Sequence, residues 1–248
     1  VYSSLDSLEI ARLNPRKNII FLGVGFETTA PAIALTLLHA KRQGLKNFSI
    51  LSSLKMIPPP MCQLAEDERL NIQGFICPGH VSAIIGLKPY EILAHRYNIG
   101  CVVAGFEPID LLEAIILLLR QIQRGKGSVE NQYSRVVKAE GNAQALKIIR
   151  EVFKVVDTEW RGLGTIKKSG LMIREKYWKF DAQKRFGITE YKNIRLPAVY
   201  KRCRCGDVLK GIISPKGCSQ FRRLCTPANP LGPCMVSTEG VCNVYYKY

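Results

Sequence analysis

Short apolar runs alternate with longer amphipathic stretches in the first half of the chain. Residues 18–25 (NIIFLGVG) form an apolar run that ends in glycine, which is typical of a buried parallel strand. Residues 32–44 (AIALTLLHAKRQG) have helical periodicity, and Thr28 or Thr29 can provide the N-cap. Residues 47–53 (NFSILSS) predict the next strand. The pattern therefore predicts a β-α-β unit.

The same pattern returns at residues 100–125, where a strand (GCVVA) leads through Gly-Phe-Glu into a helix. GVGFETTAP and VAGFEPIDL thus form a weak internal repeat that places Glu27 and Glu107 just beyond the carboxyl end of a strand. Ligands bind at that edge of open α/β sheets. Each glutamate either binds a ligand there or accepts hydrogen bonds from backbone amides at its helix start. His80, in the loop of FICPGHVS, is a third candidate for ligand binding or for a structural hydrogen bond.

The rest of the chain divides by pattern into two further segments. Residues 130–157 predict a helical stretch interrupted by Gly141, and residues 160–171 (WRGLGTIKKSGL) predict a loop. Residues 176–186 (KYWKFDAQKRF) predict a short amphipathic helix. The predicted fold class is α/β, with Rossmann-like parallel-sheet units in residues 1–125, a helical and loop segment in 126–200, and a small cysteine-rich tail in 201–248.

Composition draws attention to that tail, because six of the nine cysteines of this 248-residue chain lie in it with the spacing C-x-C-x12-C-x6-C-x8-C-x7-C. The first half is an ordinary domain, and its start has no basic region followed by an apolar one, so a disulfide scaffold for export is disfavoured. Zinc ribbons pair C-x2-C knuckles, and none occurs in the tail. An iron–sulfur cluster needs four thiolates, which leaves two cysteines for a redox-active pair. In a strand, Cys203 and Cys205 would face the same side.

The net charge of +16 suits an acidic partner such as nucleic acid. The basic residues are dispersed, however, so a solvated basic surface is favoured over a zinc-dependent nucleic-acid-binding protein. No apolar run is long enough to predict a membrane span.

Seven stretches together resemble the HypD family of hydrogenase-formation proteins, in the family's order along the chain: GFETTAP, PGHVS, GFEPID, NQYSRVV, WRGLG, SGL and CTPANPLGPCMVSTEGVCNVYYKY. The resemblance implies α/β domains around a cleft and a C-terminal region that holds a [4Fe–4S] cluster. It also implies a cytoplasmic scaffold with thiol redox activity, rather than a turnover enzyme, in [NiFe]-hydrogenase maturation. Its implied partners are the small chaperone HypC and the cyanide donor HypE, with which it assembles the Fe(CN)2CO centre.

The family pattern also implies roles for individual tail residues. The cluster ligands implied by it are Cys203, Cys218, Cys225 and Cys242, with Cys205 and Cys234 as the redox-active pair and Glu239 as a charge that tunes it. Glu27, His80 and Glu107 are the candidates for the cleft.

The sequence departs from the family pattern in its upstream motifs, and a rival function remains open. The family's upstream Cys-Gly-Gly-His-Thr and Cys-Pro-x-Cys motifs, thought to hold the nascent iron, do not occur in this sequence. The chain is therefore expected to match the central and C-terminal parts of the family and, taken alone, to lack the iron-assembly site. The main alternative is a stand-alone iron–sulfur thiol–disulfide oxidoreductase.

Overall fold

The computed structural model of the protein describes residues 2–188, 200 and 202–248. Those residues belong to two compact units. Unit 1 comprises Val1–Cys62, Gly74–Thr158 and Lys167–Glu190, and unit 2 comprises Gln63–Gln73, Glu159–Ile166 and Tyr191–Tyr248. No helix in the described part of the chain has the length and apolar character needed to cross a membrane.

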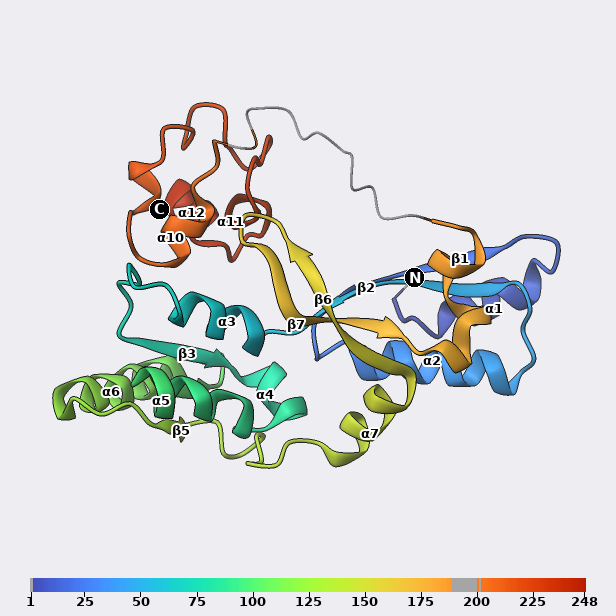
Figure 1. Cartoon of the computed structure of the whole chain (residues 1–248), viewed down its shortest axis with the longest axis horizontal. Coiled ribbons are helices and arrows are strands. Elements are labelled where there is room, and N and C mark those ends of the chain that lie inside the picture. Colours follow the sequence, from blue (N-terminus) through green and yellow to red (C-terminus); the bar gives the residue numbers. More distant parts are fainter. Residues whose placement is uncertain (1, 189–199, 201) are drawn as a thin grey trace. The chain divides into compact units, whose positions relative to one another are not determined.

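Unit 1 contains most of the regular structure (Figure 1). Its elements in chain order are α1 (Asp6–Leu13), β1 (Ile19–Gly25), α2 (Ala30–Arg42), β2 (Phe48–Lys55), β3 (Gly74–Pro78), α4 (Gly79–Ile85), the 3-10 helix η1 (Lys88–Tyr90), α5 (Glu91–Tyr97), β4 (Gly100–Ala104), α6 (Pro108–Arg124), β5 (Val129–Asn131), α7 (Ala143–Val152), the 3-10 helix η2 (Glu175–Phe180) and α8 (Ala182–Arg185). Three elements pass between the units: α3 (Pro58–Ala65), β6 (Phe153–Trp160) and β7 (Gly164–Ile173).

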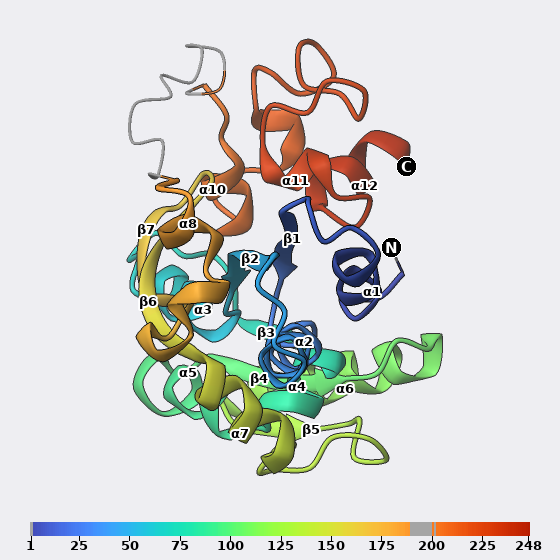
Figure 2. The same cartoon turned by 90° about the vertical axis from the view of Figure 1, so that its right-hand side faces the viewer.

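The first sheet has the strand order β1-β2-β7-β6. β1 and β2 are parallel and in register from Ile19↔Phe48 to Gly25↔Leu54, which confirms the predicted β-α-β unit. The intervening helix α2 packs its apolar side against β2 (Figures 1 and 2). Phe48, Ile50 and Leu37 are fully buried in the core formed there. A side chain at each of these positions is excluded from water, so the apolar runs seen in the sequence account for the packing.

The second sheet, β3-β4-β5, is entirely parallel. α6 lies against β4 through Ala114, which is fully buried, with Leu117 and Leu118 alongside it. Gly74 permits this approach, because a Cβ atom there would lie 2.5 Å from Leu118 Cδ2. The two copies of the Gly-Phe-Glu repeat therefore end strands of two different sheets, and the α/β fold class with parallel-sheet units is confirmed.

Three local predictions are wrong. Only Ala143–Val152 of the predicted 130–157 helical stretch forms a regular helix, and the predicted 160–171 loop is mostly strand β7. Alternate residues of β6 are buried or half-buried, a period-two pattern that the helical interpretation overlooked. β7 is held by a partner distant in sequence, since Leu171 pairs with Leu54 of β2. The predicted 176–186 helix is divided into η2 and α8, because Asp181 caps α8 through the amides of Gln183 and Lys184.

The predicted N-cap of α2 is only partly correct. Thr29 occupies the N-cap position, but its side chain does not cap the helix. Its hydroxyl instead donates a hydrogen bond to the carbonyl of Phe26 at 3.1 Å. The helix start is nevertheless where the sequence places it, since Pro31 lies in the first turn.

Candidate metal centre

Unit 2 brings the six tail cysteines together from short elements and loops. Its own elements are α10 (Cys205–Leu209), the 3-10 helix η3 (Pro215–Gly217), α11 (Pro233–Val236) and α12 (Val241–Lys247). Residues 203–205 do not form the strand in which the two cysteines would face the same side, because Cys205 opens α10 and Cys203 precedes it in a loop. Cys234 lies in α11 and Cys242 in α12.

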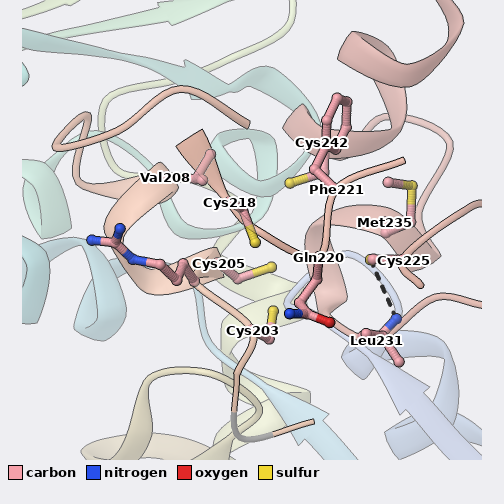
Figure 3. A pocket seen from close by; sticks show the side chains of 11 residues that line it. Cys203, Cys205, Val208, Cys218, Gln220, Phe221, Cys225, Leu231, Met235 and Cys242 are labelled. Atoms are coloured by element: carbon pink, nitrogen blue, oxygen red, sulfur yellow. Dashed lines mark hydrogen bonds between the residues drawn. The ribbon is translucent and has the colours of Figure 1, made fainter. Parts of the chain in front are cut away.

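Five of these cysteines line one small pocket, here called the cysteine pocket: Cys203, Cys205, Cys218, Cys225 and Cys242. Figure 3 shows the sulfur atoms of Cys203, Cys205, Cys218 and Cys242 directed toward its interior. Apolar side chains complete the wall, among them Val208, Phe221, Leu231 and Met235. Soft thiolate donors in an apolar surrounding suit zinc, copper(I) or an iron–sulfur cluster.

Gly232 lets the backbone pass directly beside two of the sulfurs. A Cβ atom at this position would lie 2.2 Å from Cys203 Sγ and 2.6 Å from Cys205 Sγ, so any side chain would displace them. The neighbouring Leu231 amide donates a hydrogen bond to Cys225 Sγ at 3.4 Å, and its carbonyl accepts one from Arg161 Nη2 at 2.6 Å. Backbone hydrogen bonds of Leu231 and the close approach of Gly232 therefore fix the position of the segment between Cys225 and Cys234.

Cys234 does not line the pocket but contacts two cysteines that do. Its thiol is hydrogen-bonded to those of Cys205 and Cys242, and this sharing, together with burial, holds the pKa of Cys234 well above its usual range. Hydrogen bonds with the thiols of Cys205 and Cys234 lower the pKa of Cys242 to about 4, while the thiols of Cys203 and Cys234 lower the pKa of Cys205. Thiolate is the form that binds metals and attacks disulfides.

The donor set fits a cluster chemically, since more than four thiols surround one pocket and the six tail cysteines form no disulfide. Within the described ranges, no group of three or more His, Cys, Asp or Glu side chains is arranged to hold a single metal ion. Sequence reasoning identified the cysteines but missed Leu231 and Gln220. Gln220 lines the pocket, and its Oε1 atom is buried with no hydrogen-bond partner among the described residues.

The remaining predicted site residues lie outside the cysteine pocket. Glu239 is exposed and does not line the pocket. Its backbone amide donates a hydrogen bond to Ser237 Oγ at 3.2 Å. In unit 1, His80 is exposed and packs on Phe106 with ring centroids 4.1 Å apart. Glu107 is the N-cap of α6 and forms a capping box with Asp110, so the backbone role considered for it is present.

Glu27 is 2% exposed, and both of its carboxylate oxygens accept from the Ile57 amide, at 3.0 and 3.2 Å. Burial raises the pKa of Glu27 to about 7. The ion pair between Asp110 and Arg135, at the start of α6, was not predicted from the sequence. Arg135 Nη2 lies 2.6 Å from Asp110 Oδ2 and holds the pKa of this buried carboxyl well below its usual range.

Comparison with known proteins yields one family. The family model described as "HypD: Hydrogenase formation hypA family" matches residues 1–248. The hydrogenase maturation factor HypD of Rhodobacter capsulatus is 45% identical over 249 residues, which cover 100% of this chain and 66% of the relative. A putative hydrogenase expression/formation protein of Methanocaldococcus jannaschii is 46% identical, covering 100% and 68%. The hydrogenase expression/formation protein HupD of Azotobacter chroococcum is 42% identical, covering 100% and 66%. The chain thus spans about two thirds of the length of these relatives.

Proposed function

Because the chain belongs to the HypD family of hydrogenase formation proteins, we propose that its cysteine pocket holds a [4Fe–4S] cluster and serves hydrogenase maturation. The observation that supports the cluster most is that five cysteines from separate segments line one pocket. Bound there, a cluster supplies electrons one at a time. The free thiols fit a reducing compartment, and we place the protein in the cytoplasm.

Cys203, Cys218, Cys225 and Cys242 are the ligands in this proposal, and Cys205 with Cys234 is the redox-active pair. Two features support the division. Cys234 is the tail cysteine outside the pocket lining, and its thiol is hydrogen-bonded to that of Cys205. Cys205 lines the pocket and contacts Cys234, so it lies between the ligands and its partner.

The thiol chemistry of the pair balances as a two-electron exchange. The Cys205 thiolate attacks a disulfide of a partner and forms a mixed disulfide, and one partner thiolate leaves and takes up a proton. The Cys234 thiol loses its proton and attacks Cys205 Sγ, which releases the second partner thiol and leaves a Cys205–Cys234 disulfide. An external dithiol reductant would restore the dithiol by giving up two electrons and two protons and becoming a disulfide. Glycine at position 232 leaves room for Cys205 Sγ beside the backbone.

The partners follow from the resemblance. We propose a HypC-like chaperone, which carries the nascent iron as substrate, and a HypE-like cyanide donor. In this proposal the complete maturation machinery assembles the iron centre, and this chain contributes the cysteine pocket and the α/β unit to it. A stand-alone thiol–disulfide oxidoreductase is the second candidate, favoured by the hydrogen bond between Cys205 and Cys234.

Paired serine variants test the division of roles. Cys203→Ser is expected to lose most of its iron after anaerobic purification, whereas Cys205→Ser keeps its iron and loses exchange with a disulfide substrate. Cys62→Ser, at a half-buried cysteine of unit 1, is the control and should change neither. The readouts are iron content and thiol titration.

Equal iron loss in the Cys203→Ser and Cys205→Ser variants would contradict the division. Introduced into the chromosomal gene of the host, Cys205→Ser should abolish hydrogenase activity. Normal hydrogenase activity with loss of small-disulfide turnover would instead favour the stand-alone oxidoreductase.

A further inference from the structure

A second pocket lies in unit 1 and is here called the basic pocket. Glu27, His80 and Glu107 do not line it. The pocket forms where the end of α2 and the following residues meet η2 and α8, and it has a cavity volume of about 590 Å³. Five of its ten lining residues are cationic: Lys41, Lys46, Lys176, Lys179 and Arg185. None of the ten is acidic, so the lining attracts anions.

Four of the five cations have no carboxylate within ion-pair distance among the described residues. These are Lys41, Lys46, Lys179 and Arg185. Lys176 is neutralised by Glu151, whose carboxylate lies 2.6 Å away and also accepts from the Tyr177 hydroxyl at 2.5 Å. Uncompensated like charges gathered at one pocket repel one another, and a bound polyanion would relieve that repulsion.

Arg185 is held in place by neutral partners in the fold. Arg185 Nη1 donates to the Phe48 carbonyl at 3.4 Å, and Nη2 donates to Asn18 Oδ1 at 3.1 Å. Lys41 is positioned over the buried Tyr177 ring, with Nζ 5.0 Å from the centroid. The cationic lining therefore rests on core elements of unit 1, rather than on freely moving lysines alone.

An aromatic side chain distinguishes this pocket from a simple anion site. Trp178 lines it and is 51% exposed, and Lys179 Nζ lies 5.9 Å from its ring centroid. Exposed aromatic rings beside cations are the arrangement on which nucleic-acid bases stack while their phosphates meet the charges. An acidic peptide would use the lysines but has no need of the ring.

We propose that the basic pocket binds a nucleoside polyphosphate, with the phosphates at Lys41, Lys46 and Lys179 and the base on Trp178. The pocket is of the size that small-ligand sites reach. This inference concerns unit 1 and does not depend on the cluster proposed for unit 2.

Tryptophan fluorescence provides the test, because the chain has two tryptophans and Trp160→Phe leaves Trp178 as the reporter. ATP without added metal should quench the fluorescence saturably. Inorganic triphosphate should displace ATP and restore the signal, and adenosine should bind more weakly than ATP. Titration calorimetry of ATP into the unsubstituted chain should give the same affinity as the fluorescence titration of Trp160→Phe. If that variant is unstable, calorimetry on the unsubstituted chain is the test.

Lysine variants locate the site. Lys46→Ala and Lys179→Ala should each weaken ATP binding about tenfold, since each removes a charge-assisted contact to phosphate. Lys126→Ala, at an exposed lysine of unit 1 outside the pocket, should leave ATP binding unchanged. Absence of saturable binding at millimolar ATP, equal weakening by Lys126→Ala, or displacement of ATP by polyglutamate at lower concentration than by triphosphate would overturn the proposal.

Discussion

At the scale of single residues, Glu27 is a carboxyl group of unit 1 whose pKa folding strongly raises. It follows β1 and is almost completely buried, no cation among the described residues forms an ion pair with it, and the Ile57 amide donates to both of its oxygens. Burial outweighs that amide and raises the pKa from 4.5 to about 7. The folded protein therefore holds a proton that the unfolded chain has lost at intermediate pH.

Stability should accordingly depend on pH with a defined sign. The contribution of Glu27 to the free energy of unfolding is fully present below pH 4.5 and decreases as the pH rises toward 7. Above pH 7 it has been lost and changes no further. The loss is on the order of 3 kcal/mol in the free energy of unfolding. Glu27→Gln should remove this part of the dependence. Urea unfolding followed by tryptophan fluorescence, at pH 4.5 and pH 8, measures the difference between the two proteins, and an identical pH dependence would contradict the assignment.

At the scale of elements, α7 illustrates a helix start that the sequence encodes locally. Asn142 is its N-cap, and Asn142 Oδ1 accepts a hydrogen bond from the Ala145 amide at 2.9 Å. Ala145, Ile149 and Val152 are buried on one side of the helix. The cap fixes where the helix begins, and the apolar side fixes how it packs.

Asn142→Ala should therefore lower the free energy of unfolding by about 1 kcal/mol, because one helix-start amide loses its acceptor. Asn142→Asp retains an acceptor oxygen and is the matched control. The measurement is the urea midpoint at constant slope. A loss of equal size in both variants would show that the amide group, rather than the cap, is what matters at this position.

The elements also show how far sequence reasoning reached. The β1-α2-β2 unit was predictable because its strand, helix and strand are contiguous and each has its own periodicity. β6 and β7 were missed, since β7 is specified by pairing with β2, more than a hundred residues earlier. The cysteines were identified by residue type, whereas Gly232 and Leu231 act through backbone positions that no side-chain pattern reveals.

At the scale of the whole molecule, the two units differ in what fills their cores. Unit 1 is built on large apolar side chains such as Phe48, Phe153 and Tyr90. Four of the seven buried residues in the core of unit 2 are cysteines, and the other three are Val208, Leu231 and Met235. A core of this size contributes little burial of apolar surface, so bound metal should contribute much of the order in unit 2.

Removal of metal should therefore affect the two units unequally. Treatment with a chelator under anaerobic conditions should abolish hydrogen-exchange protection at amides of α10, α11 and α12, and leave the amides of β2 and β4 protected. Reconstitution with iron and sulfide should restore it. Equal loss of protection in both units, or no loss in unit 2, would contradict a structural role for the metal.

The most direct test of the central claim is the content of iron and acid-labile sulfide in protein purified without oxygen, read together with its visible spectrum. A [4Fe–4S] cluster in the cysteine pocket predicts about four irons and about four sulfides per chain and a brown protein. One zinc per chain with no iron, or iron without sulfide, would contradict the account.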